Sequence, residues 1–403
     1  MQKKLLALAV AGTLGGTLGA PTVAQAQSST VQVFGTMYVE YTLPYGTKQG
    51  RSTAVGNPEL SKADFLQTPG SEVGFKGEEQ LGGGLSAWYQ CTTTADPRGQ
   101  SQNGWCSRNS ALGLKGGFGN VYVGNWDTPF KRTISPTTVG GNDTGIWGTA
   151  FLITADSTTD AVGANRANFK KRQNNSINYD SPNFGGFQVM GTVSSSQPST
   201  ATLNGATNNK PRLWSLGLQY SAGPLYVSGA YEIHRGYSGL AGPDKSKDTG
   251  LHVGAAYTFG PVRFGGLYTR QKFEVPVGVA GGDVKVGAFH TGVDWTIAGP
   301  HGLRASYTQA GNMKGAAGFL VGTAAGAGYR PCPGGCGMVG AKTGAKLYTI
   351  RYVYTFSKRT EFNAGYVKLH NDSGAAYNLG GLGAAHVNGD GQHAWAVSMR
   401  HTF

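Results

Sequence analysis

The chain contains residue types that could carry out catalysis, but their spacing matches none of the common catalytic arrangements. It has no His-Glu-x-x-His pair, no Gly-x-Ser-x-Gly turn and no cysteine–histidine arrangement typical of a nucleophile. Residues 340–346, Gly-Ala-Lys-Thr-Gly-Ala-Lys, lack the Gly-Lys-Ser/Thr order of a phosphate loop, and no helical pattern follows them. Residues 388–391, Asn-Gly-Asp-Gly, are more typical of a turn than of a weak calcium site. We therefore expect no catalytic, cofactor-binding or metal site.

The four cysteines could form disulfides if the chain is exported. Four cysteines allow three pairings, and the sequence alone does not choose among them. Short separation favours Cys91 with Cys106 and Cys332 with Cys336, each pair within one loop. A zinc site is the alternative, but the chain has no Cys-x-x-Cys pair and no histidines clustered near these cysteines.

The chain is basic, with a formal net charge of +13. A basic chain suggests nucleic-acid binding, but the cations are dispersed along the sequence rather than gathered in one stripe. We therefore expect no nucleic-acid partner. In an exported protein, dispersed positive charge is better suited to a conduit that attracts anionic solutes.

The amino terminus has the layout of a secretory signal peptide. Lys3 and Lys4 precede an apolar run from residue 5 to about 20, and residues 24–26, Ala-Gln-Ala, form a small-x-small cleavage site. A membrane-anchoring helix is the alternative, but glycines interrupt the run, which is shorter than the ~20 apolar residues that a spanning helix needs. We predict that residues 1–26 are a signal peptide and that residues 27–403 form the mature chain.

Apolar and polar residues alternate with a period of two in many segments, as expected for strands with two different faces. Clear examples are residues 31–41, 251–259, 289–297, 347–356 and 394–403. Aromatic residues gather near the ends of such segments, as in the headgroup girdles of membrane barrels. A soluble β-sandwich is the alternative, but the isolated charges and small residues on the polar face are better suited to a wetted interior.

The connections between these strands alternate between short turns and long loops, which is the layout of outer-membrane barrels. No run of 18 apolar residues follows residue 26, so a chain that crosses a membrane would have to do so as a closed barrel. We predict an all-β fold, a transmembrane antiparallel up-and-down β-barrel of about 16 strands, a number that leaves an aqueous channel. The long loops cover about residues 43–70, 93–106, 128–170, 197–212, 235–249, 274–286, 311–344 and 371–391.

Charged residues that share the polar parity are predicted to line the interior, because a lipid-facing Arg or Lys at mid-depth costs about 2–4 kcal/mol. For each of them a position at the rim is the alternative. Arg108 shares the parity of Leu112 and Leu114, so it either lies at the rim or follows a bulge. The predicted pore-lining residues are Lys76, Arg172, Arg263, Arg304, Arg351 and Arg400, with Glu72 and Asp294, and Glu40, Glu232 and Glu361 are further acidic candidates.

Four stretches, in order along the chain, carry a family resemblance. They are residues 71–85 (Ser-Glu-Val-Gly-Phe-Lys-Gly-Glu-Glu-Gln-Leu-Gly-Gly-Gly-Leu), 175–187 (Asn-Ser-Ile-Asn-Tyr-Asp-Ser-Pro-Asn-Phe-Gly-Gly-Phe), 354–360 (Tyr-Thr-Phe-Ser-Lys-Arg-Thr) and 400–403 (Arg-His-Thr-Phe). Together they resemble the trimeric general-diffusion porins of betaproteobacteria. The resemblance implies a homotrimer in the lipid of the outer membrane of a Gram-negative bacterium. Glu72 departs from the basic residue that the family often has there, which would weaken an anion preference.

The resemblance also implies that the third loop, about residues 128–170, folds inward and narrows the pore. Residues 146–153 are too apolar for an exposed loop tip, so we expect them to pack on the inner wall; contact with another subunit or with lipid is the alternative. Asp143, Asp156 and Asp160 would make this constriction loop acidic and oppose it to a basic wall, which gives a transverse field.

We therefore expect a passive channel for small hydrophilic solutes and inorganic ions, with a slight anion preference, no cofactor and no enzymatic activity. A substrate-selective channel, a barrel enzyme and a barrel adhesin are the alternatives.

Overall fold

The structure is a computed structural model, and part of the chain is described. No helix in that part is long and apolar enough to cross a membrane. The predicted signal peptide, residues 1–26, lies outside it. The described residues are 31–44, 64–99, 104–142, 144–154, 169–195, 211–236, 246–274, 282–315, 342–375, 377, 379–380, 389 and 391–403.

Nearly all of the regular structure in these ranges is β-strand. The helices, α2 (Pro129–Ile134), η2 (Ser135–Thr137) and α3 (Ala150–Ile153), are short and follow one another between two strands. In chain order the strands are β1 (Gln32–Pro44), β2 (Phe65–Gln67), β3 (Glu72–Gly82), β4 (Leu85–Thr94), β5 (Ser110–Gly116), β6 (Gly119–Asp127), β7 (Arg172–Asp180), β8 (Phe187–Ser194), β9 (Arg212–Ala222), β10 (Leu225–Arg235), β11 (Lys247–Phe259), β12 (Val262–Phe273), β13 (Val284–Ala298), β14 (His301–Ala310), β15 (Ala345–Ser357), β16 (Thr360–Asn371) and β17 (Gln392–Thr402).

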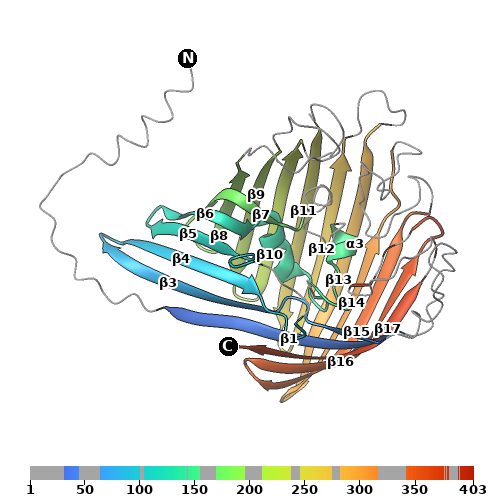
Figure 1. The fold of residues 1–403 in the computed structure, drawn as a ribbon. Helices are drawn as coiled ribbons and strands as arrows, with labels where there is room; N and C mark the ends of the chain where they lie inside the picture. Colours follow the sequence, from blue (N-terminus) through green and yellow to red (C-terminus); the bar gives the residue numbers. More distant parts are fainter. Residues whose placement is uncertain are drawn as a thin grey trace, which may run out of the picture.

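The strands form one antiparallel sheet that closes into a barrel (Figure 1). Strands that are neighbours in the sequence pair with each other, and β1 closes the ring by pairing with β17. Both β2 and β3 pair with β1, with a register shift of one residue between them, so together they form one barrel strand, here called a stave. The seventeen strands described therefore make sixteen staves, which confirms the predicted all-β, up-and-down barrel.

Side chains alternate between an apolar outer face and a polar inner face, as the period-two pattern predicts. On β11, Leu251, Val253 and Phe259 are 43%, 53% and 72% exposed, whereas His252 between them is fully buried. Closure pairs the backbone groups of every stave, so this apolar outer face can contact lipid without unpaired edges. Trp88 points inward and is 8% exposed, whereas its neighbour Tyr89 takes the outer face and is 39% exposed.

The described part of the third loop lies inside the barrel, as predicted (Figure 1). Its helix α2 packs against β9, β10 and β11, η2 contacts β11 and β12, and α3 contacts β13 and β14. Ile146, Trp147 and Ile153 are at most 1% exposed, so the apolar segment of the loop packs on the inner wall. Gly265 and Gly292 on that wall face Val139 of the loop so closely that a Cβ at either position would overlap it.

Candidate pore constriction

The start of the third loop is fixed to the inner wall by buried hydrogen bonds. A hydrogen bond of 2.7 Å joins Oγ1 of Thr133, in α2, to Nε2 of His252. The Ser228 hydroxyl donates to the Thr133 carbonyl at 2.8 Å, and the Phe130 amide donates to Ser215 Oγ at 3.2 Å. Polar side chains on β9, β10 and β11 therefore form hydrogen bonds with polar groups of the loop that would otherwise be buried without partners.

A cluster of ion pairs surrounds the base of the same loop. Arg132 donates to both carboxylate oxygens of Asp180, at 2.7 and 2.9 Å. Burial alone would lower the pKa of Arg132, but the hydrogen bonds and charge of Asp180 raise it overall. Asp127, at the end of β6, pairs with Lys131 at 2.9 Å and with Arg172 at 3.3 Å. The predicted residue Arg172 thus lies beside the loop base, where charges of both signs are paired.

Four of the predicted pore-lining residues lie in one row on the inner face. Arg263, Asp294, Arg304 and Arg351 stand directly opposite one another on β12, β13, β14 and β15. Alternating parity therefore brings three arginines and one aspartate to the same level of the barrel, which the period-two pattern alone does not reveal.

The third loop contacts this row through its backbone. Arg263 donates to the carbonyl of Pro136 at 2.8 Å, and the Gly140 amide donates to the carboxylate of Asp294 at 2.9 Å. Arg263 and Asp294 thus fix the position of the loop backbone on the inner wall.

Arg351 is covered by the loop and is 2% exposed. Its Nη2 donates to Oδ1 of Asn142 at 2.9 Å and to the Gly141 carbonyl at 3.2 Å. Its guanidinium lies 5.1 Å from the ring centroid of Trp147, a distance at which a cation–π interaction is favourable. Arg351 therefore adds positive charge beneath the loop but has almost no exposed surface of its own.

Arg304, the third residue of the row, reaches an acidic residue on β16. Arg304 donates two hydrogen bonds to Glu361, at 3.1 and 3.2 Å, and lies 3.9 Å from Asp294. Arg400 stands opposite Glu361 in the register of β16 and β17 and is exposed. Arg304 thus satisfies the carboxylate of Glu361, and Arg400 has no ion pair with any residue that the structure describes.

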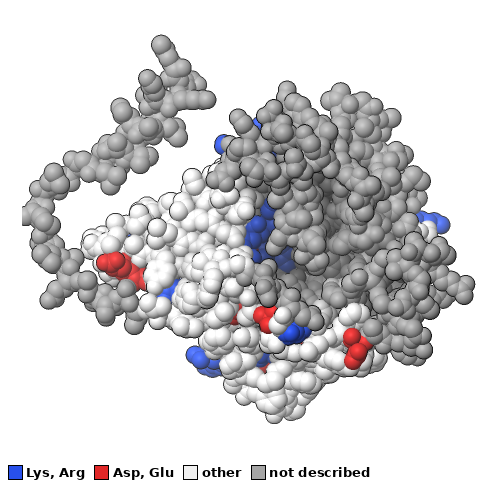
Figure 2. Space-filling model, in the orientation of Figure 1, with Lys and Arg blue, Asp and Glu red and all other residues white. Residues whose placement is uncertain are grey.

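An open cavity of about 340 Å³ separates the third loop from the wall formed by β1, β3, β16 and β17. The loop contributes Ser135 and Asn142, and the wall contributes Glu72, Glu361 and Arg400. Figure 2 shows lysine and arginine side chains inside the hollow at the centre of the face in view. The cavity is the space between the loop and the wall at this level of the barrel, and it is large enough for several water molecules.

Glu72, which lines this cavity, is paired with a neighbouring cation. Arg108 donates to it at 2.5 Å, and both side chains are partly exposed. Arg108 precedes β5, so it is outside the alternation that made its parity difficult to interpret. Lys76, also on β3, is exposed and lies 5.1 Å from the ring centroid of Phe34.

The charged side chains on the described part of the loop and directly after it are all basic. Asp143, Asp156 and Asp160 lie outside the described residues. The described part of the loop carries the cations Lys131, Arg132, Lys170 and Lys171 and no acidic side chain. Acidic contacts come from the wall instead: Glu40 accepts a hydrogen bond of 2.8 Å from the Ile146 amide.

Sequence reasoning missed Arg132 and Lys131 because parity applies to strands and not to a loop. It also missed the inner aromatic cluster, in which Trp88 lies 5.4 Å from Tyr122 and 5.7 Å from Trp126. Among the described residues, no group of three or more metal-ligating side chains is present.

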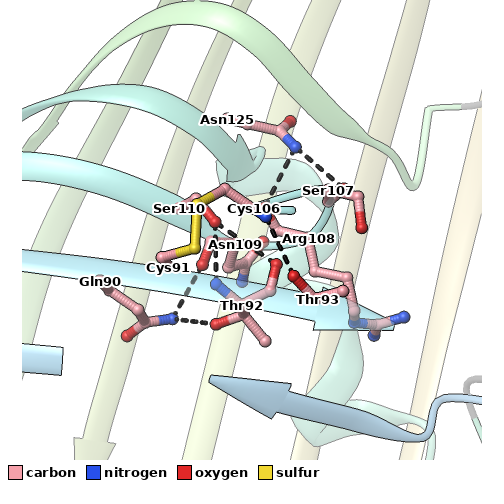
Figure 3. Close-up of a disulfide and its surroundings, with 10 residues drawn as sticks. All are labelled: Gln90, Cys91, Thr92, Thr93, Cys106, Ser107, Arg108, Asn109, Ser110 and Asn125. Atoms are coloured by element: carbon pink, nitrogen blue, oxygen red, sulfur yellow. Dashed lines mark hydrogen bonds between the residues drawn. A yellow bond between two sulfur atoms is a disulfide. The ribbon is translucent and has the colours of Figure 1, made fainter. Parts of the chain in front are cut away.

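A disulfide joins Cys91 to Cys106, which confirms the predicted pairing (Figure 3). It lies where the ladder between β4 and β5 ends. Around it the Cys106 amide donates to Thr93 Oγ1 at 3.0 Å, and the Arg108 amide donates to the Thr92 carbonyl at 2.9 Å. The bridge thus continues the link between these strands beyond their ladder. Cys332 and Cys336 lie outside the described residues.

A closed sixteen-stave barrel with an apolar outer face and an inward loop defines a class, the channel-forming β-barrels of membranes. The profile of one family, described as Gram-negative porin, matches residues 7–375. The chain therefore belongs to the Gram-negative porins, whose barrels lie in the outer membrane.

Two relatives and one solved structure illustrate the similarity. The major outer membrane protein P.IB of Neisseria meningitidis is 31% identical over 239 residues, so 58% of this chain aligns with 60% of that relative. The outer membrane porin protein 32 of Delftia acidovorans is 28% identical over 412 residues and the alignment covers both chains in full. The anion-selective porin from Comamonas acidovorans has the same fold, with a TM-score of 0.68, 22% identity and coverage of 93% of this chain and 100% of that one.

Proposed function

We propose that this porin forms a water-filled channel through which small hydrophilic solutes and inorganic ions diffuse passively, with a slight preference for anions. The proposal rests on the polar cavity between the third loop and the opposite wall, which has charged groups on its border. It assigns no catalytic role to the chain.

The observation that carries the anion preference is the difference in pairing between acidic and basic side chains. Glu72, Asp127, Asp180 and Glu361 each have a cationic partner. Within the described ranges no carboxylate forms an ion pair with four of the interior cations, and positive charge therefore remains to attract anions through the low-dielectric wall. These cations are Lys76, Arg263, Arg351 and Arg400.

We assign the pore-lining role on the same basis. Lys76, Arg400 and the Glu72–Arg108 pair would contact solutes directly, because they are exposed or partly exposed on the inner face. Arg351 would act through its field alone. The remaining pore-lining residues in this assignment are Arg172, Arg263, Arg304 and Asp294, and Asp143, Asp156 and Asp160 are proposed as the acidic residues of the constriction loop.

We also propose a homotrimer in outer-membrane lipid, cleavage of residues 1–26 and a second disulfide between Cys332 and Cys336. The trimer is supported by a shared fold: the trimer form of OmpT from Vibrio cholerae has a TM-score of 0.61 with 15% identity, and the match covers 93% of this chain and 99% of that one.

The reversal potential of the purified protein in a planar bilayer tests the function. In a gradient of potassium chloride we expect stepwise channel opening. The reversal potential should be small and should have the sign of the chloride equilibrium potential. Cation selectivity would contradict the anion preference, and absence of current would contradict the channel. Saturable, solute-specific block of the current would instead favour a substrate-selective channel.

A further inference from the structure

A row of three lysines crosses the outer face of the barrel at the loop ends of β12, β13 and β14. Lys272 and Lys285 are partners in the register of β12 and β13. Lys285 and Lys314 exchange backbone hydrogen bonds of 2.7 and 2.9 Å, so they also stand directly opposite each other. Arg270 points to the same face two residues before Lys272 and is exposed. Like charges placed directly opposite on a sheet are destabilising unless something neutralises them.

The chain neutralises only part of this charge. Lys272 pairs with Asp283 at 2.7 Å. Arg270, Lys285 and Lys314 form no ion pair with any residue that the structure describes. The segments 275–281 and 316–341, which flank the row in the sequence, contain no Asp or Glu.

A hollow of about 480 Å³ lies beside these cations. Gly287 and Gly311 are neighbours in its floor, since the Gly311 amide donates to the Gly287 carbonyl at 2.8 Å. Arg270 is the partner of Gly287 in the register, so two successive positions beside the guanidinium have no side chain. We call this space the outer-face hollow; it is bordered by Arg270, Lys285, Lys314, Tyr268, Phe289 and Gln309.

The outer-face hollow lies at a defined level of the membrane. Tyr268 and Phe289 border it on the side away from the loops and are 48% and 40% exposed. Phe289 continues into a row with Tyr307 and Tyr348, whose rings lie 5.5 and 5.0 Å apart in succession. Aromatic rings on the outer face of such barrels mark the headgroup level, and the long loops mark the external side. The cations therefore lie among the headgroups of the outer leaflet.

We propose that the outer-face hollow binds the phosphorylated headgroup of an outer-leaflet lipid. Phosphate oxygens would accept hydrogen bonds from the guanidinium of Arg270 and the ammonium groups of Lys285 and Lys314, which are the side chains best suited to phosphate. The acyl chains would lie along the apolar outer face below Tyr268 and Phe289. This site is separate from the channel and does not depend on the function proposed above.

Native mass spectrometry of the detergent-purified protein tests the proposal, with bisphosphorylated lipid A as the probe. The double variant K285Q/K314Q removes the facing pair of lysines. The double variant K358Q/R359Q is the matched control, because it removes two exposed cations from the turn at the opposite end of the barrel. We expect the wild type and the control to bind alike and K285Q/K314Q to bind about tenfold more weakly, a change of about 1.4 kcal/mol.

Three further measurements complete the test. The single variant R270Q should also weaken binding, and far-UV circular dichroism and conductance should show that each variant keeps a folded, open barrel. Lipid A from which the phosphates have been removed should bind the wild type about as weakly as bisphosphorylated lipid A binds K285Q/K314Q. The proposal would be overturned if K285Q/K314Q bound bisphosphorylated lipid A as tightly as the wild type does. It would also be overturned if the wild type bound the dephosphorylated lipid as tightly as the bisphosphorylated one, or if an equimolar amount of inorganic phosphate displaced the lipid.

Discussion

The inner surface of the barrel has two regions with different surroundings. On β9 to β14 the third loop covers the wall, and residues there such as Thr269 and His290 are at most 2% exposed. On β1, β3, β16 and β17 the wall borders the open cavity, and charged residues such as Glu72 and Arg400 reach it. The same alternation of side chains thus yields a covered interface in one region and an open surface with charged residues in the other.

The difference indicates that the third loop, rather than the strand pattern, determines which part of the wall stays open. In the covered region the loop backbone supplies hydrogen-bond partners; for example, the Thr269 hydroxyl donates to the Ile153 carbonyl at 2.6 Å. Close contact there also requires missing side chains, as at Gly265 and Gly292. Beside the uncovered region, ion pairs join β3 to β5 and to the segment before it, and the Cys91–Cys106 disulfide joins β4 to that segment.

The largest effect is expected from the double variant C91S/C106S, which removes the covalent link beside the uncovered region. The cysteines are 15 residues apart, and closing a loop of that length contributes about 3 kcal/mol to stability. Urea unfolding in detergent should show a loss of that order, with channel conductance unchanged. C332S/C336S is the control, since a bridge over a shorter loop contributes less. Equal stability of the wild type and C91S/C106S would contradict the prediction.

Gly292→Val should disturb the covered region. A Cβ at this position overlaps the Val139 carbonyl, so the loop must shift; overpacking of this kind costs about 1–3 kcal/mol. Single-channel recording should show altered or fluctuating conductance. Gly191→Val is the matched control, because a Cβ at that strand glycine meets no atom within 4 Å. An unchanged conductance in Gly292→Val would mean that the loop is not held by this contact.

Arg400→Gln should act in the uncovered region and should change selectivity without changing stability. A charge about 4 Å from an ion in water contributes about 1 kcal/mol, so the preference for anions should fall several-fold. The reversal potential should show this in about 0.1 M salt and much less in 1 M salt, because the Debye length falls from about 10 to 3 Å. Arg359→Gln, an exposed turn residue, should have little effect. A shift as large in Arg359→Gln would show that the cavity is not the ion path.

The smallest effect is expected for Glu72→Gln. Removing this carboxylate, which lines the cavity, leaves its partner Arg108 without that ion pair, so the anion preference should rise slightly. Exposed ion pairs contribute about 0–1 kcal/mol, which sets the scale of the change. Glu79→Gln is the control, since Glu79 is exposed on the outer face of the same strand. A fall in anion preference would show that Arg108 does not act as a free cation in the variant.

Features that depend on neighbouring residues in the sequence could be predicted. The staves, their two faces and the inward direction of Arg263, Asp294 and Arg304 all follow from a period of two, because lipid penalises charge on the outer face. Cys91 with Cys106 followed from proximity in the chain.

Features that depend on contacts between distant segments could not be predicted. Arg132 pairs with Asp180 only because the loop folds inward. Trp88 points inward and packs against the rings of Tyr122 and Trp126. The division of the interior into covered and open regions has the same origin, since the strand pattern is alike in both.

Cysteine accessibility tests that division most directly. Thr36 borders the open cavity, whereas Thr269 is 1% exposed beneath the loop. A charged, water-soluble methanethiosulfonate reagent added during single-channel recording should reduce the current through Thr36→Cys and leave Thr269→Cys and the wild type unchanged. Equal modification of both variants, or modification of Thr269→Cys alone, would contradict the account.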